Sequence, residues 1–251
     1  MSVLTLACPE STVHETTAAV VMRVLEANDC DVRQITGSRD DLIQRLMQEE
    51  IDLFVSAWLP DIDADMLAYG VTPLGDLFKV NAYCCLCNET LPLSSLADIA
   101  SKGENLSRNI TTPLSLQKTM EKVLHRYELD KAGFTLHVLP DSEALTELSA
   151  MSAENQPVLI PLFYPCYLFY RTTLKPLSDP LTAMGKEQTA RILIRKNLLE
   201  QQQLDQDMLD ELEELMLSAK IITAMDYAIH KEGLTAHEAA EAWQRGKLLI
   251  R

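Results

Sequence analysis

The N-terminal part of the chain alternates between short apolar segments, which predict strands, and segments in which apolar residues recur with helical spacing. Strands are predicted at 3–7, 31–36 and 51–60, with helices at 13–25 and 41–47 between them. Ser38 and Asp41 form a helix-starting pair in front of the second helix. The order strand, helix, strand, helix, strand predicts a parallel sheet, because each helix carries the chain back to start the next strand.

The middle of the chain repeats this alternation. Helices are predicted at 94–100, 113–127 and 142–151, and strands at 109–111, 134–139 and 157–162. Beyond Pro180 the pattern is helical, with predicted helices at 186–200, 204–217, 221–231 and 235–245. Thr235 and Glu238 form a capping box at the last of these. Two α/β units without a flexible linker predict two lobes that share crossing strands and enclose a cleft.

Composition and charge limit the kind of partner. The chain has 251 residues, of which 47% are hydrophobic and 24% charged, as in a soluble globular protein. Its net charge is −15 and its basic residues are scattered, which argues against nucleic acid or an anionic membrane as partner. No apolar run is long enough for membrane insertion. The sequence as written has no signal peptide and predicts a cytoplasmic protein, or a periplasmic or cell-surface one if a leader was removed.

Motifs for catalysis, cofactors and metals are scarce. The sequence has no Gly-x-Gly-x-x-Gly, phosphate-binding loop, His-Glu-x-x-His or Gly-x-Ser-x-Gly, so no cofactor is expected. The "YCCLC" run at 83–87 has no second ligand cluster, which favours buried thiols over a metal site. The nucleophile–base pairing that the sequence offers is Cys166 with His14 or His137, so a Cys166-dependent enzyme is one hypothesis.

Two aromatic segments interrupted by proline lie at predicted strand ends: "SAWLPD" at 56–61 and "LFYPCYLFY" at 162–170. Ligands of open α/β folds bind at such ends. A quaternary ammonium ion has no proton to donate, so a protein holds it against several aromatic ring faces through cation–π contacts. The pattern therefore indicates an aromatic cage for such a cation.

Several segments resemble the substrate-binding proteins of glycine betaine, proline betaine and choline ABC importers, the family with the OpuAC-type domain. They are "VLEANDCDV" (24–32), "IDLFVSAWLPD" (51–61), "PLGDLF" (73–78), "LFYPCYLFYRTTLKPLSDP" (162–180) and "LEELMLSAKIITAMDYAIHKEGLTAHEAAEAWQ" (212–244). The resemblance implies an α/β, two-lobed type II periplasmic-binding-protein fold with a helical C-terminal region. It implies lobe I at 1–82 with 171–251, lobe II at 83–170, a ligand cleft between the lobes, and no catalytic residues.

The resemblance also implies a set of ligand-binding residues. Phe163 and Tyr167 stand where the family has two tryptophans of the cage, and Cys166 stands where it has a histidine that helps to hold the ligand carboxylate. Cysteine cannot replace that donor. Ile43, at a further cage position of one branch, has no ring. The predicted ligand-binding residues are Glu10 and Ser11 of "CPES", Trp58 of "AWLP", Pro113 and Ser115 of "TPLS", Phe134, Phe163, Cys166 and Tyr167.

Two hypotheses outside catalysis follow. The first is a protein that binds a small polar or quaternary ammonium solute, either as the substrate-binding component of an ABC importer, with a permease as candidate partner, or as a cytoplasmic relative. The second is a ligand-sensing or regulatory module that has kept the fold and lost betaine binding. We predict that Trp58, Phe163 and Tyr167 project into one cleft.

Overall fold

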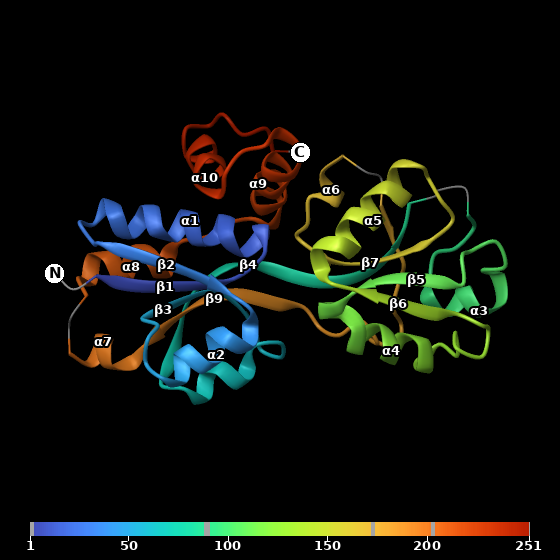
Figure 1. Cartoon of the computed structure of the whole chain (residues 1–251), viewed down its shortest axis with the longest axis horizontal. Helices are drawn as coiled ribbons and strands as arrows, with labels where there is room; N and C mark the ends of the chain where they lie inside the picture. Colours follow the sequence, from blue (N-terminus) through green and yellow to red (C-terminus); the bar gives the residue numbers. More distant parts are fainter. Residues whose placement is uncertain (1–2, 88–90, 172–173, 202–203, 251) are drawn as a thin grey trace. The chain divides into compact units, whose positions relative to one another are not determined.

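The computed structural model describes residues 3–87, 91–171, 174–201 and 204–250 (Figure 1). The chain divides into two compact units, unit 1 (1–80 and 188–251) and unit 2 (81–187). It leaves unit 1 within β4 (Val71–Leu86), close to the predicted boundary after residue 82. The second division differs from the predicted one at 171, because β8 (Lys175–Pro176) pairs with the unit 2 part of β4.

Unit 1 is built on a mixed sheet whose strands follow the order β2-β1-β3-β9-β4. The other strands are β1 (Leu4–Pro9), β2 (Val32–Gly37), β3 (Leu53–Leu59) and β9 (Gln188–Arg195). As the alternation predicts, β1 runs parallel to β2 and β3. β9, which lies outside that alternation, is antiparallel to both β3 and β4, so the sheet of unit 1 as a whole is mixed.

The segment that forms β9 was predicted as part of a helix at 186–200, and this prediction is wrong. Residues 188–195 form a strand, and only α7 (Lys196–Glu200) at the end of the segment is helical. Ile192, Leu193 and Ile194 are fully buried between the two neighbouring strands. A short apolar run fits helix and strand equally well in sequence, and pairing on both sides decides for the strand.

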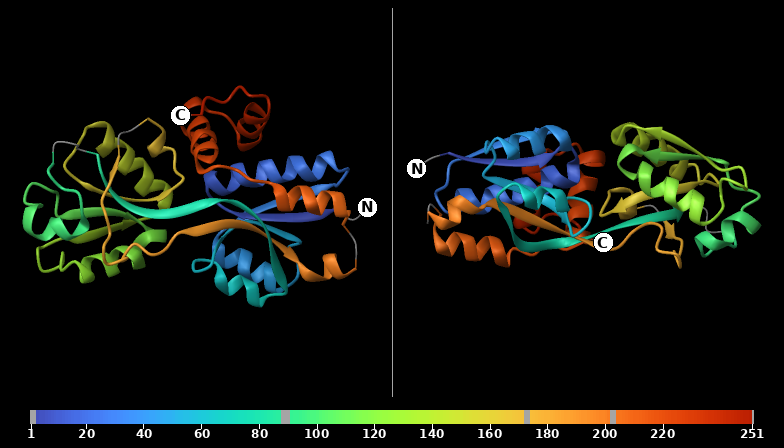
Figure 2. Two further views of the ribbon diagram at one scale, coloured as in Figure 1. Left: turned by 180° about the vertical axis from the view of Figure 1, so that it is seen from behind. Right: turned by 90° about the horizontal axis from the view of Figure 1, so that it is seen from below.

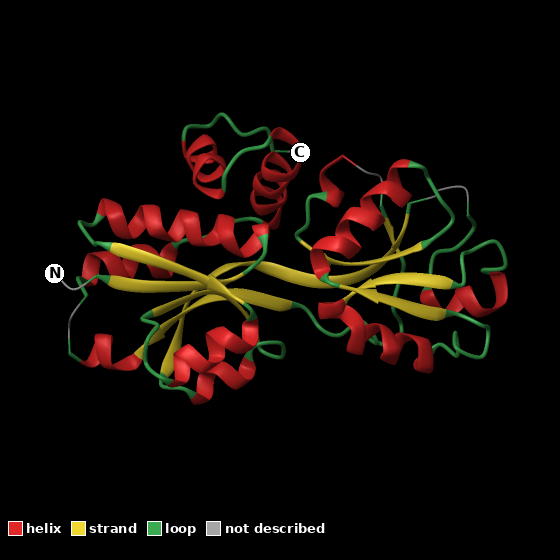
Figure 3. Ribbon diagram, in the orientation of Figure 1, coloured by secondary structure: helices red, strands yellow, loops and turns green. Residues whose placement is uncertain are grey.

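Helices cover both faces of the unit 1 sheet (Figure 3). They are α1 (Thr12–Ala27), α2 (Arg39–Met47), the 3-10 helix η1 (Ala64–Ala68), α7, α8 (Gln206–Glu214), α9 (Ala219–Glu232) and α10 (Ala236–Gln244). α1 packs on β1 and β3 and contacts α8, α9 and α10, whereas α2 packs on β1 and β2. The predicted caps are confirmed: Ser38 accepts from the amide of Asp41, and Thr235 forms a capping box with Glu238.

Unit 2 has its own strands and helices (Figure 2). Its strands are the second part of β4, β5 (Asn109–Pro113), β6 (Thr135–Leu139), β7 (Leu159–Tyr164) and β8. Its helices are η2 (Leu96–Asp98), α3 (Ile99–Lys102), η3 (Leu114–Leu116), α4 (Gln117–Arg126), α5 (Asp141–Ala153) and α6 (Leu168–Arg171). β5 and β6 are parallel, β4 and β7 are antiparallel, and α4 and α5 both pack on β5 and β6.

Each unit has a hydrophobic core. In unit 1, α2 packs Leu42 and Leu46 against Phe54 of β3. In unit 2, Leu86, Met120 and other apolar side chains of β4, α3, α4 and β7 form one cluster. These two cores fix the strand ends from which the predicted ligand-binding residues emerge.

Candidate functional site

Trp58 lies at the carboxyl end of β3, where the chain makes a tight turn. Its backbone amide donates to the Asp63 carboxylate at 2.7 Å, and its carbonyl accepts from the Asp63 amide at 3.0 Å. The Leu59–Pro60 peptide bond in this turn is cis. Arg39 of α2 donates to the same carboxylate at 2.9 Å, so the turn is bonded to the start of α2.

The indole ring of Trp58 is held on one face and at its nitrogen. His14 of α1 stacks on the ring, with centroids 4.9 Å apart and planes inclined by 21°. The indole Nε1 donates to Ser56 Oγ at 3.2 Å. Ser11 caps α1, and its hydroxyl oxygen lies 2.6 Å from His14 Nδ1. Trp58 and His14 each keep only 9% of their surface exposed, so the pair is a nearly buried stack.

Burial shifts the pKa of two groups around Trp58. It lowers the pKa of His14 to about 4, and a polar interaction with the Ser56 backbone opposes this shift only in part. The imidazole behind the indole is therefore neutral near pH 7. Burial also raises the pKa of Asp63, while the Trp58 amide and the Arg39 guanidinium favour its ionised form.

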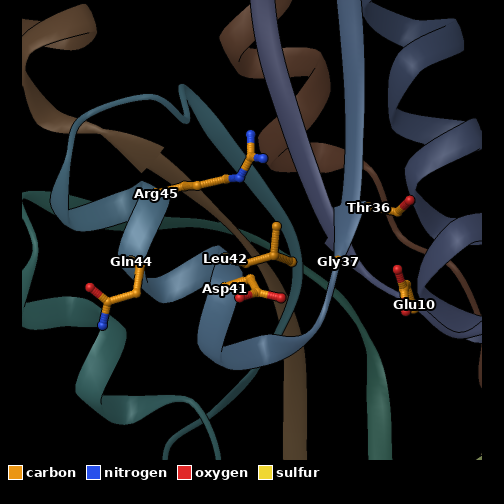
Figure 4. A pocket seen from close by; sticks show the side chains of 7 residues that line it. All are labelled: Glu10, Thr36, Gly37, Asp41, Leu42, Gln44 and Arg45. Carbon is orange, nitrogen blue, oxygen red and sulfur yellow. The ribbon is translucent and has the colours of Figure 1, made fainter.

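Glu10 and Ser11, which were predicted from the sequence, follow β1 and open α1, the helix that carries His14. Glu10 also lines a cavity of about 350 Å³ at the carboxyl ends of β1 and β2, shown in Figure 4. In Figure 4, Glu10 and Thr36 lie on one side of this cavity, and the labelled side chains of α2 lie on the other. The residues that line it are Glu10, Thr36, Gly37, Asp41, Leu42, Gln44 and Arg45. Because this set contains no aromatic ring, the cavity offers a ligand polar contacts and no cation–π contact.

In unit 2, the predicted residues Phe163, Cys166 and Tyr167 lie at and just after the end of β7, around the cis Tyr164–Pro165 bond. Phe163 is partly buried and packs against the unit 2 core. Cys166 is 6% exposed and Tyr167 5% exposed. The hydroxyl of Tyr167 donates to the carbonyl of Leu145 in α5 at 3.3 Å. The three side chains are thus carried by one strand end and the turn after it, and all of them are largely or partly buried.

The sequence analysis missed a cluster of three partly buried rings beside these residues. Tyr83 of β4, Tyr164 of β7 and Phe169 of α6 have centroids 5.2 to 6.4 Å apart, and both tyrosines meet Phe169 edge to face. Strand alternation is the signal that could have found Tyr164, because it must point to the face of β7 opposite to Phe163. Burial raises the pKa of Tyr83 in this cluster.

Phe134 and Ile43 lie in cores. Phe134 is 2% exposed within the unit 2 cluster, and the Arg108 guanidinium lies 4.4 Å from its ring centroid. A cation of the protein itself therefore occupies one face of the ring that a ligand would need. Ile43 belongs to the α2 side of the unit 1 core. A direct ligand contact by Phe134 stays a prediction that requires this packing to open.

Pro113 ends β5, and Ser115 lies in η3, the turn that leads into α4. The backbone amide of Ser115 donates to Asp141 Oδ1 at 2.9 Å. The backbone amide of this predicted ligand-binding residue is therefore already bonded to a carboxylate of unit 2. The side chain of Leu114, between the two predicted residues, is 58% exposed.

The structure gives little support to a thiol enzyme. His14 is held by Ser11 and Trp58, and its low pKa makes it a poor general base near pH 7. His137 is exposed on β6, whereas Cys166 is buried. Among the described residues, no group of three or more His, Cys, Asp or Glu side chains could hold a metal ion. In the same part of the chain, no helix has the length and apolar character needed to cross a bilayer.

Comparison with known proteins identifies the family. The family OpuAC, described as the substrate binding domain of the ABC-type glycine betaine transport system, matches residues 2–245. The chain belongs to this family. The predicted resemblance is thereby confirmed, and the class to which the chain belongs binds a substrate for transport. A search of curated proteins found no match.

Solved structures similar to this OpuAC-family protein share its fold. Lactococcal OpuAC in a closed complex with glycine betaine has a TM-score of 0.80 at 20% identity, over 98% of this chain and 96% of that chain. The glycine betaine/L-proline-binding protein ProX of Borrelia burgdorferi has a TM-score of 0.77 at 22% identity, over 96% and 92%. An ABC-transporter choline-binding protein in complex with choline has a TM-score of 0.75 at 17% identity, over 96% of this chain and 88% of that chain. The predicted α/β fold of the two-lobed binding proteins is confirmed.

Proposed function

We propose that this protein binds a small quaternary ammonium solute for an ABC importer, and that it prefers choline to glycine betaine. The observation that supports the solute-binding function is the family match over residues 2–245, which favours it over a regulatory module. A permease is the partner that such a function requires. Members of the family are usually periplasmic or surface-anchored, and we infer the same location here.

Aromatic side chains at two strand ends fit the quaternary ammonium group. Trp58 lies near the end of β3, Phe163 lies near the end of β7, and Tyr167 follows β7. Each ring can contribute a cation–π contact of about 0.5 to 2 kcal/mol. That these three rings face one ligand stays a prediction, and substitution of each ring by leucine, which keeps the apolar volume, tests it separately.

The preference for choline is supported by Asp141. Its carboxylate accepts from the amide of Ser115, within the "TPLS" segment that is predicted to contact the ligand. Two like charges 4 Å apart repel by about 1 kcal/mol in water and about 4 kcal/mol near a protein surface. Glycine betaine carries a carboxylate and choline carries a neutral hydroxyl, which can donate to a carboxylate. Cys166, a weak donor, does not replace the missing partner of a ligand carboxylate.

Calorimetric titration and thermal shift with choline and glycine betaine test the proposal. At 100 times its dissociation constant, a ligand stabilises the protein by about 2.7 kcal/mol. For a chain of this size, this corresponds to an increase in Tm of about 5 to 10 °C. We expect that increase with choline, and a smaller one with glycine betaine at equal concentration. Tighter binding of glycine betaine would contradict the preference, and no shift with either would contradict the solute-binding function.

The variant D141N isolates the charge. Asparagine keeps an oxygen that can accept from the Ser115 amide, so the turn is retained while the negative charge is lost. We expect D141N to raise the affinity for glycine betaine relative to that for choline. Glu143 lies in the same first turn of α5 and is exposed, so E143Q is the matched control and should leave the ratio unchanged.

A further inference from the structure

Residues of unit 1 restrain Trp58 at three places, two on its ring and one on its backbone. His14 covers one face of the indole, Ser56 Oγ accepts from Nε1, and Asp63 bonds both the amide and the carbonyl of the Trp58 backbone. His14 is itself restrained, because Ser11 Oγ is 2.6 Å from its Nδ1. The plane of the indole is thus set by contacts from α1 and β3, and the turn after β3 fixes the backbone that carries it.

Ser56 adds an independent observation, because its backbone is strained. Its φ is +67°, in the left-handed region that side-chain-bearing residues rarely adopt, and it is completely buried. The pairing of β3 with β9 shifts register between Phe54 and Ala57, which places Ser56 in a bulge. Bulges redirect side chains, and backbone strain of this kind concentrates at functional sites. Here the bulged Ser56 lies two residues before Trp58, whose ring nitrogen it bonds.

We propose that His14 and Ser56 are positioning residues that hold the indole of Trp58 in the orientation in which it meets the cationic ligand. This inference rests on the proposed function, since Trp58 must contact the ligand. The imidazole of His14 fixes the plane of the indole by stacking on one of its faces, and it makes no contact with the opposite face.

The charge of His14 fits this role. A cation stacked on one face of an indole competes for the same π system as a ligand cation on the other face. Burial keeps His14 neutral near pH 7, so it supports the ring without that competition. A lysine or arginine behind the ring would support it equally well and weaken the site.

The first experiment measures the mobility of the ring without ligand. The chain has two tryptophans, so a W243F background leaves Trp58 as the single fluorophore. In that background, time-resolved anisotropy should show rapid ring motion in H14A and S56A that is absent from the unaltered site. H14F, which restores a stacked ring, should suppress the motion again. Equal anisotropy decays in the presence and absence of His14 and Ser56 would overturn the proposal, whether or not a ligand is found.

The second experiment tests whether His14 acts through Trp58, using the dissociation constant for choline. We expect W58A to weaken binding by about tenfold, H14A by about fivefold, and H14F by less than about twofold. In the W58A background, H14A should have almost no further effect, because residues that act as a unit are not additive. His237 is an exposed histidine of the same unit, and H237A should bind as tightly as the wild type.

The outcomes separate the inference from the function on which it rests. If H14A weakens choline binding as much in the W58A background as in the wild type, His14 does not act through Trp58 and the proposal is wrong. If neither choline nor glycine betaine binds the wild-type protein, the proposed function fails, and the anisotropy still decides whether His14 and Ser56 hold the ring. If H14A does not fold, S56A is compared with S56G. Both variants lose the hydroxyl, and S56G also relieves the backbone strain. Equal increases in the motion of the Trp58 ring would identify the hydroxyl as the restraint.

Discussion

Mild acid should destabilise unit 1 through His14. The imidazole is buried, and its pKa is lowered from 6.5 to about 4 mainly by the loss of solvation. Above pH 6.5 the ring is neutral in both the folded and the unfolded state, so it adds no pH dependence. Below pH 6.5 the unfolded state binds a proton that the folded state does not. The free energy of unfolding therefore decreases as the pH is lowered, until the pKa of His14 in the folded state is reached.

The size of this effect follows from the two pKa values. Each pH unit between 6.5 and about 4 corresponds to 1.36 kcal/mol, so the full effect of His14 is about 3.4 kcal/mol. At pH 5 about 2 kcal/mol of this is lost. With a urea dependence of about 2 kcal/mol/M, that loss lowers the midpoint of unfolding by about 1 M.

Urea unfolding at pH 7, 6 and 5, followed by tryptophan fluorescence, measures the effect. Both tryptophans, Trp58 and Trp243, lie in unit 1, so the signal reports that unit. H14F keeps an aromatic ring against Trp58 and cannot titrate. The wild type should lose about 2 kcal/mol more than H14F between pH 7 and 5. Asp63 has a raised pKa and acts in the opposite direction, but it is present in both proteins and cancels in the difference.

Equal losses in the wild type and H14F would refute this reasoning. Such a result would mean that His14 accepts a proton in the folded state near its usual pKa, and that it is not buried as a neutral ring against Trp58. H237A removes an exposed histidine of the same unit and should follow the wild type at every pH.

Substitutions at three further sites test other contacts, each by the change in Tm. A Cβ at Gly75 (φ +63°) would lie 2.8 Å from the Leu212 carbonyl oxygen, and one at Gly70 (φ +68°) meets nothing within 4 Å. G75A should therefore lower the free energy of unfolding by clearly more than the roughly 1 kcal/mol expected for G70A. Equal losses would contradict the close approach of Gly75 to Leu212. Y127F should cost about 1 to 3 kcal/mol, because the Tyr127 hydroxyl donates to Asp179 and accepts from the Leu181 amide; an unchanged Tm would contradict this. D63A should lower Tm more than D63N, which keeps an acceptor for the Trp58 amide; the reverse order would contradict the importance of that bond.

The sequence predicts best the elements that depend on local chemistry. α1, α2 and α10 lie close to their predicted positions, because amphipathic spacing and the caps at Ser38 and Thr235 are local signals. The strands β4 and β9 depend on pairing between distant segments, and β9 was mistaken for a helix for this reason. β5 and β7 were predicted from short apolar runs that neighbouring turns delimit.

The candidate site shows the same division. The "AWLP" segment singled out Trp58, but no local pattern announces its partner His14, since their contact depends on how α1 packs on β3. In "LFYPCYLFY", composition drew attention to Phe163, whereas alternation along β7 places Tyr164 on the other face with Tyr83 and Phe169. The bond from Ser115 to Asp141 joins two helix starts and likewise cannot be read from either segment alone.

Two aspartates in the motifs that carry the resemblance have structural roles in this chain. Asp61 of "AWLPD" bonds Gln188 at the start of β9, where its amide donates to the glutamine oxygen at 2.7 Å. Asp179 of "LSDP" accepts from Tyr127 and from the Met184 amide, and so holds the turn after β8. Residues that hold turns preserve a fold whatever the ligand. The proposed preference for choline rests instead on two other positions: Cys166, which is a weak donor for a ligand carboxylate, and Asp141, which places a negative charge beside Ser115.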